Sequence, residues 1–168
     1  YWNDSPFYGS ARPCFSTIAG GPVGLAAPLE ASGRVNAVNF DATVGVGWTE
    51  HVTGQWMATV WRDGTYTWIA PDLGVGNNVL TEAFDVNGDG SVIVGEWYQV
   101  STARTNAARW DWNGTSYDLT DLGVLPGTPQ TSTGRSFATG VSDDGTIVVG
   151  MNRFNNAGPF SLQTGVLW

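Results

Sequence analysis

The strongest constraint on the fold is that one short pattern occurs three times along the chain. Each copy has a short strand-like stretch, a turn rich in Asn, Asp and Gly, and a β-branched run closed by Gly; the copies lie at 35–48, 83–97 and 138–150. Their closing glycines, Gly47, Gly95 and Gly150, are 48 and 55 residues apart. Turn residues that tolerate positive φ, set between Val and Ile runs, are typical of β-hairpins. The repeat therefore predicts three equivalent hairpins.

A second kind of hairpin is expected to alternate with the first. Four segments carry its pattern: 13–21, 58–66, 108–117 and 159–165. An aromatic residue is expected at the equivalent, core-forming place in each: Phe15, Trp61, Trp110 and Phe160. Asp72 and Asp121 follow the two central copies, and we expect them to accept backbone hydrogen bonds where a strand ends.

A period of about 50 residues, with four short strands per unit, is typical of β-propeller blades. No 3.6-residue periodicity is present, so the chain is expected to be all-β. We expect one repeat domain over 1–168, with units at approximately 1–34, 35–82, 83–137 and 138–168. These amount to about 3.5 units, fewer than the roughly four to eight blades of a closed propeller.

An incomplete propeller has three ways to satisfy its open edges. The chain can self-associate into a ring, pair with another chain, or close on itself by pairing residues 1–30 with the strands after Ala138. We expect assembly with other copies or with another chain.

The three elements of the repeat resemble a known family. The pattern G-V-S-x-D-G-T-x-V-V-G at 140–150, A-R-W at 108–110 and D-L-G-x-L-P-G at 121–127 resembles the HAF-type extracellular repeat of bacterial secreted proteins. The resemblance covers most of residues 11–168, and the first and last units depart from it. It implies a β-propeller that is secreted to the cell surface or beyond. It supplies no catalytic residue, because the matching positions are fold-forming.

Charge and composition remove several classes of function. The net charge is −8, with seven Arg and no Lys. A chain this acidic repels phosphate backbones and anionic membranes, so neither nucleic acid nor membrane insertion is expected. Without Lys there is neither Schiff-base chemistry nor a P-loop ammonium. No apolar run approaches the ~20 residues of a membrane helix.

Catalytic constellations are scarce. The sequence has one His, His51, in a turn-like segment, and one Cys, Cys14, so neither a multi-histidine zinc site nor an internal disulfide is possible. Most carboxylates sit where a turn explains them, and Asp63-Gly64, Asp89-Gly90 and Asp144-Gly145 are turn dipeptides. We therefore expect a non-enzymatic protein. A hydrolase with two carboxyl groups ~5–10 Å apart across an acidic cleft stays open as a third interpretation.

One segment fits a calcium loop. Residues 85–96 match the twelve-residue pattern of oxygen ligands, with Asp85, Asn87 and Asp89 as candidate ligands for Ca²⁺. The equivalent copies keep the glycines and lose the carboxylates, which favours a hairpin turn. A strand from 91 to 95 would also carry Glu96 roughly 15 Å from the turn, at ~3.3 Å per residue. The hairpin is favoured, and a calcium site is the alternative.

Aromatic residues supply the remaining candidates. Trp56, Trp97 and Trp112 depart from the regular spacing, so we expect some of them at sheet ends or loop tips, where a ring can stack on a sugar or anchor a protein partner. The leading hypothesis is an extracellular module for protein–protein assembly. A lectin-like, carbohydrate-binding module is the alternative.

Overall fold

The structure is a computed structural model that describes residues 13–17, 21–28, 32–74, 80–126, 134–155 and 161–168. Its regular elements are strands, apart from one short 3₁₀ turn at Val100–Thr102. Within these ranges no helix is long and apolar enough to cross a membrane. The predicted all-β class is confirmed.

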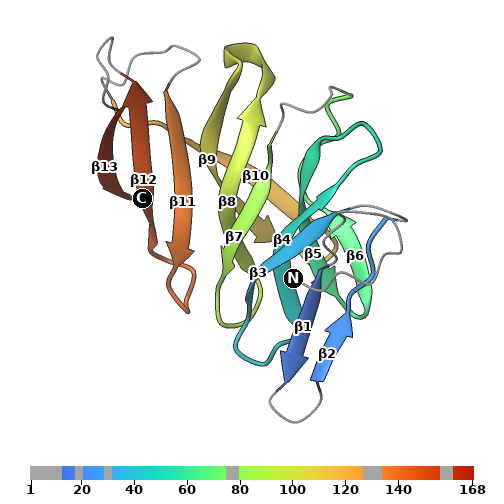
Figure 1. The fold of residues 1–168 in the computed structure, drawn as a ribbon. Coiled ribbons are helices and arrows are strands. Elements are labelled where there is room, and N and C mark those ends of the chain that lie inside the picture. The colour runs from blue at the N-terminus through green and yellow to red at the C-terminus, as the bar shows by residue number, and fades with distance from the viewer. Residues whose placement is uncertain (1–12, 18–20, 29–31, 75–79, 127–133, 156–160) are drawn as a thin grey trace.

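Three antiparallel sheets and one separate hairpin make up the fold (Figure 1). The first sheet contains β3 (Gly33–Val38), β4 (Val44–Glu50), β5 (Trp56–Arg62) and β6 (Thr65–Trp68). The second sheet contains β7 (Glu82–Val86), β8 (Val92–Gln99), β9 (Arg104–Trp112) and β10 (Tyr117–Gly123). The third sheet contains β11 (Arg135–Val141), β12 (Val148–Asn155) and β13 (Ser161–Leu167), and the separate hairpin is β1 (Cys14–Thr17) with β2 (Gly21–Gly24).

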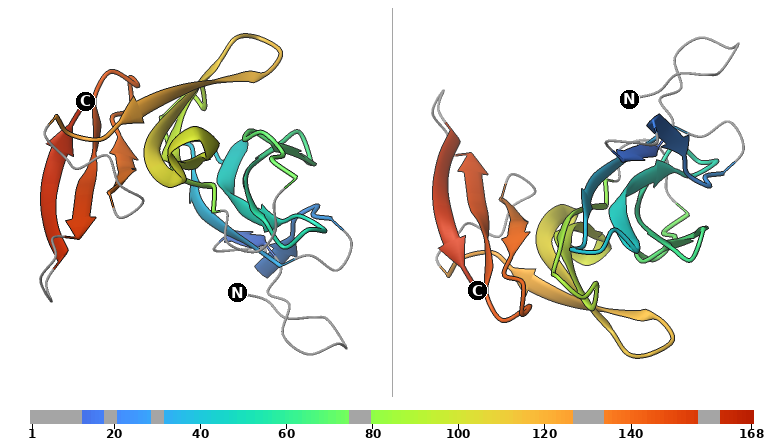
Figure 2. Two further views of the ribbon diagram at one scale, coloured as in Figure 1. Left: turned by 90° about the horizontal axis from the view of Figure 1, so that it is seen from above. Right: turned by 90° about the horizontal axis from the view of Figure 1, so that it is seen from below.

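The sheets follow one another in chain order along an open arc (Figure 2). The hairpin β1–β2 lies at one end and the third sheet at the other. No closed barrel or propeller is formed by the described residues. In particular, β1 pairs with β2 and not with the strands after Ala138, so the closure by residues 1–30 is not seen among them.

The three predicted hairpins of the first kind are confirmed, and local side-chain hydrogen bonds explain their turns. In each turn a polar side chain accepts the amide five residues later: Asn39 from Val44, Asn87 from Val92, and Ser142 from Ile147. An Asp two residues further on then accepts a second amide: Asp41 from Thr43, Asp89 from Ser91, and Asp144 from Thr146. Short polar side chains stabilise turns in this way, so the sequence specifies the turn without help from the core.

A β-bulge explains the glycine that closes each copy. The pairing register of β3 with β4 shifts between Val35 and Ala37. The same shift recurs in the first strand of the other two sheets. The shift turns a carbonyl toward the paired strand, so that a Cβ on Gly47 would lie 1.9 Å from the Arg34 oxygen. Gly95 and Gly150 stand in the same position, at 2.0 and 1.9 Å. Only glycine fits there.

The second kind of hairpin also forms at its two central predicted copies, 58–66 and 108–117. Strands β5 and β6 are joined by Asp63-Gly64, both with positive φ (54° and 75°), as a tight two-residue turn requires. Strands β9 and β10 are joined by a loop that begins at Asn113-Gly114. Asp121 accepts the amide of Gly123 at 2.8 Å, and Asp72 makes the equivalent bond to Gly74, so the predicted role of both carboxylates is confirmed.

The predicted hairpin at 159–165 is wrong. Thr164 and Gly165 do not turn; they lie inside β13, opposite Asn152 and Met151. The residue equivalent to Trp61 and Trp110 is Trp168, which exchanges two backbone hydrogen bonds with Val148. The equivalence of Phe160 with the two tryptophans fails for this reason, and Phe160 itself lies outside the described residues.

The core lies between successive sheets. We call the face of a sheet toward the preceding sheet its leading face, and the opposite one its trailing face. The trailing face of the first sheet and the leading face of the second form one apolar cluster, whose large members are Val44, Val46, Val60, Val86, Ile93 and Trp110. The second sheet packs on the third in the same way, through Val92, Val94, Val148 and Trp168 among others. Each sheet therefore needs its neighbour to bury its apolar residues.

Candidate functional site

The trailing face of the third sheet has no neighbour within the described residues. Ile147 occupies the position of Val44 and Val92, three residues before the closing glycine. Val44 is 1% exposed and Val92 6%, because the next sheet covers them, whereas Ile147 is 50% exposed. The third sheet therefore exposes an apolar side chain at a position that the other two sheets bury.

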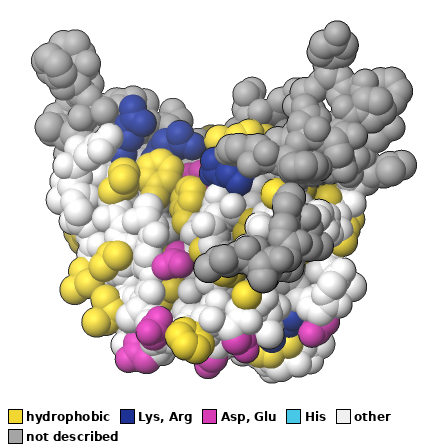
Figure 3. Space-filling view, turned by 60° about the horizontal axis from the view of Figure 1, so that its bottom comes forward, with side chains coloured by type: hydrophobic (Ala, Val, Ile, Leu, Met, Phe, Trp, Pro, Cys, Tyr) yellow, Lys and Arg dark blue, Asp and Glu magenta, His cyan; other side chains and the backbone are white. Residues whose placement is uncertain are grey.

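The same contrast holds for the neighbouring positions of this face. Val149 corresponds to Val46 and Val94, which are both fully buried, and it is 45% exposed. Leu167, opposite Val149 on β13, corresponds to Val60 on β5; the exposed fractions are 70% and 3%. Figure 3 shows hydrophobic side chains at the left edge of the molecule, over the third sheet. We call Ile147, Val149 and Leu167 the open face.

The turns of the first kind of hairpin pack on the preceding sheet. A Cβ on Gly90 would lie 2.7 Å from Val44, and a Cβ on Gly145 would lie 2.6 Å from Val92, so each turn glycine packs directly on the preceding sheet. An arginine of the preceding sheet then donates to the carbonyl of that glycine: Arg62 to Gly90 at 2.8 Å, and Arg109 to Gly145 at 2.6 Å. The packing of the turn glycine is thus repeated between successive sheets, whereas the two arginines stand at different positions of β5 and β9. On the third sheet, Ile147 stands where the next turn glycine would pack.

A line of charged side chains runs across the three sheets near the first strand of each, β3, β7 and β11. Arg34 on β3 pairs with Glu82 on β7, and Glu82 lies directly opposite Glu96 on β8. Both glutamates are buried. Burial raises the pKa of Glu96 to about 8; Arg135 lowers this pKa, and the negative charge of Glu82 raises it further. Glu96 is therefore mostly protonated at neutral pH.

The carboxyl pair Glu82 and Glu96 has the residue types of the third, hydrolytic interpretation, but it lies under other side chains. Neither of the two grooves described below is lined by either glutamate. Glu82 joins the first and second sheets, since it pairs with Arg34 and also accepts a hydrogen bond from Asn36 of the first sheet at 2.8 Å.

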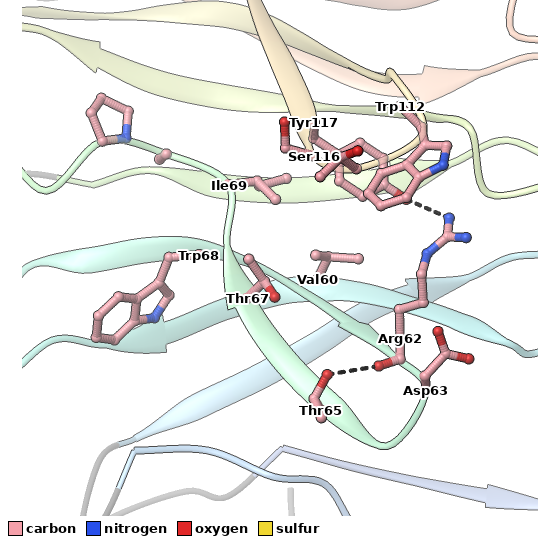
Figure 4. Close-up of a pocket in the computed structure, with 13 residues that line it drawn as sticks. Val60, Arg62, Asp63, Thr65, Thr67, Trp68, Ile69, Trp112, Ser116 and Tyr117 are labelled. Atoms are coloured by element: carbon pink, nitrogen blue, oxygen red, sulfur yellow. Dashed lines mark hydrogen bonds between the residues drawn. The ribbon is translucent and has the colours of Figure 1, made fainter.

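A groove of about 460 Å³ lies between the first and second sheets (Figure 4). One wall is formed by the hairpin β5–β6 and the residues that follow it, and the other by the β9–β10 loop. Its aromatic lining is Trp68, Trp112 and Tyr117. A smaller groove of about 330 Å³ lies on the leading face of the first sheet and includes Val38 and Trp61.

The three predicted tryptophans have different surroundings. Trp112 lines the larger groove. Trp56 stacks on Trp48, with ring centroids 3.8 Å apart and planes within 4°. Trp97 is half-buried against the core between the first and second sheets. The structure therefore brings one of the three, Trp112, to a groove.

The candidate calcium ligands are engaged in separate contacts. Asp85 accepts the backbone amide of Val141 in the third sheet at 3.0 Å. Asn87 accepts from Val92, and Asp89 from Ser91, within the hairpin turn. Glu96 lies on β8, beyond the turn. No group of three or more metal-binding side chains occurs in the described part of the chain. Calcium binding by these residues remains a prediction.

Sequence reasoning missed the open face and most of the groove. The signal for the open face was available: aligning Leu167-Trp168 with Arg109-Trp110, instead of matching Phe160, places Leu167 on a strand that faces the next unit. The groove had no such signal, because it joins hairpins from two different units. No protein-family model, curated protein or solved structure matches the chain.

Proposed function

We propose that the chain is a non-enzymatic module of a propeller-like array, which assembles with another protein chain through the open face. The observation that carries this proposal is the exposure of Ile147 and Val149, whose counterparts are buried in both other sheets, and of Leu167, whose counterpart Val60 is buried in the first sheet. Covering such side chains contributes about 1 kcal/mol each at half exposure. A partner sheet therefore gains stability from the contact.

The turns favour a partner built from the same repeat. The amide of Phe40 in the first turn donates to Gly88 in the second, and the amide of Gly88 donates to Asp143 in the third, each at 3.2 Å. These bonds link successive turns in one direction along the arc. The equivalent donor in the third turn is the amide of Asp143, which has no backbone acceptor among the described residues. A further unit of this kind supplies that acceptor, and a second copy of this chain contains such units.

The unpaired edge of β13 supports the same proposal. Strand β13 pairs with β12 on one side, and no described strand pairs with its other side, whereas the first and second sheets have a fourth strand there. Unpaired edges invite association with another chain. A partner that covers the open face also reaches this edge.

Two further points belong to the proposal. The resemblance of the repeats to HAF-type repeats supports an extracellular or cell-surface location, in a bacterial secreted protein. The net charge of −8 supports a protein partner rather than nucleic acid. The sheets resemble propeller blades but form an open arc. A propeller-like array that two or more chains complete together accounts for both features.

The experiment is to measure self-association of the wild-type chain and of the double variant Ile147→Ser, Leu167→Ser by sedimentation velocity. We expect concentration-dependent association of the wild type and a monomeric double variant with an unchanged far-UV spectrum. Val52→Ser is the matched control, since Val52 is an exposed apolar residue in the loop between β4 and β5, away from the open face. A wild type that stays monomeric, with a high melting temperature, would contradict the proposal.

A further inference from the structure

We propose that the larger groove, between the first and second sheets, binds a neutral saccharide. This goes beyond assembly, because the groove lies away from the open face and is built by β5, β6 and the β9–β10 loop. Its volume of about 460 Å³ falls within the range of small-molecule sites, roughly 300–1,000 Å³, and suits about one or two sugar rings.

The aromatic wall of the groove is held in place before any ligand arrives. Tyr117 packs against Trp112, with ring centroids 5.0 Å apart, and its hydroxyl donates to the Gly90 carbonyl at 2.6 Å. Arg62 lies over the Trp112 ring at 4.8 Å and donates to the same carbonyl. Figure 4 shows the Trp112 and Tyr117 rings across the groove from Thr65 and Thr67. A fixed aromatic wall offers an apolar surface for the C–H face of a sugar ring without loss of side-chain entropy on binding.

Two exposed polar groups at the groove are free to bond to a ligand. The hydroxyl of Thr67 and the carboxylate of Asp63 make no hydrogen bond within the described part of the chain, and both residues are exposed. The Nε of Arg62 is buried and has no acceptor there. This N–H is closed off from solvent, so the polar contacts open to a ligand are those of Thr67 and Asp63. Together Thr67 and Asp63 offer a hydroxyl and a carboxylate, which are groups that recognise sugar hydroxyls.

Other classes of ligand fit the groove less well. Phosphorylated ligands are repelled by a chain of net charge −8. A metal ion needs several oxygen ligands, and Asp63 is the one carboxylate among the lining residues. A wholly apolar ligand would cover Asp63 without giving its carboxylate a partner. A neutral, hydroxyl-rich ring satisfies both the aromatic wall and the polar groups.

The test is calorimetric titration with a panel of neutral disaccharides: cellobiose, maltose, lactose, xylobiose and chitobiose. We expect binding of at least one of them, weakened about tenfold or more by Thr67→Val and by Asp63→Asn. Both changes are at exposed positions, and Asn tolerates the positive φ of Asp63. Asp143→Asn is the matched control, because it removes one exposed carboxylate outside the groove.

The outcomes separate cleanly. Binding that is lost in both groove variants and kept in the control supports the proposal. No binding of any disaccharide at millimolar concentration overturns it, as does binding that neither groove variant changes. Trp112→Leu is a second check: a folded Trp112→Leu chain that binds as tightly as the wild type also overturns the proposal. Self-association is measured separately, so failure here leaves the assembly proposal standing.

Discussion

Replacing Glu96 by Gln is expected to remove a pH dependence from the folding equilibrium. Glu96 is buried between the second and third sheets, and this burial raises its pKa from 4.5 to about 8. Between these two pH values the folded chain holds a proton that the unfolded chain has lost. The free energy of unfolding therefore falls as the pH rises from about 4.5 to 8, and this contribution is complete and constant above pH 8.

The magnitude follows from the same two pKa values. Each pH unit in this window is worth about 1.4 kcal/mol, so the difference between 4.5 and about 8 corresponds to about 5 kcal/mol. Gln carries no charge at any pH, and it keeps the size of the side chain. The stability of the Glu96→Gln variant relative to the wild type should thus rise by about 5 kcal/mol across this window.

The assay is urea unfolding of both proteins, followed by tryptophan fluorescence, at several pH values from 4.5 to 9. The difference between the proteins isolates Glu96, since every other titrating group is common to both. Glu50→Gln controls for the loss of one carboxylate, at the end of β4 in the first sheet. If the two stability curves run parallel over this range, within about 1 kcal/mol, the reasoning about buried Glu96 is refuted.

Three further predictions test the packing of the repeat. Gly47→Ala should lower the free energy of unfolding by about 3 kcal/mol or more, because its Cβ would lie 1.9 Å from a backbone carbonyl oxygen. Gly45→Ala on the same strand is the control: its Cβ meets its first contact at 3.7 Å, so it should cost less than about 1 kcal/mol in urea unfolding. Trp168→Ala should cost about 3 kcal/mol by the same assay, because the ring packs against the core between the second and third sheets. Hydrogen bonds from its turn hold the pKa of Asp144 at about 2, so Thr146→Ala should raise the pKa measured by NMR, and an unchanged value would contradict the turn geometry.

The turns were predictable from sequence because their determinants are local. Asn39, Asn87 and Ser142 each bond to a backbone amide within five residues, so residue types and spacing suffice to find the hairpins. The reason for the closing glycines was not predictable, because the clash at Gly47 involves the carbonyl of Arg34 on the paired strand and depends on the bulge.

The candidate sites depend on how sheets pack, and this explains why sequence reasoning found only part of them. Trp112 was identified as a possible ligand contact, but Arg62 and Thr67 were not, since they belong to a different unit and meet Trp112 only across the groove. The alignment of the last unit is wrong because Phe160 was matched to Phe15 of the first hairpin, whereas Trp168 is the residue that corresponds to Trp61 and Trp110. Register, which decides that equivalence, is set by pairing with β12.

Hydrogen exchange at low and high protein concentration tests the central claim most directly, because it locates the surface that association covers. The account predicts slower exchange at high concentration in the turn and strand from Asp143 to Val149 and along β13, with the loop between β4 and β5 unchanged. Exchange that is independent of concentration throughout the chain, or slowed only in segments away from the third sheet, would contradict it.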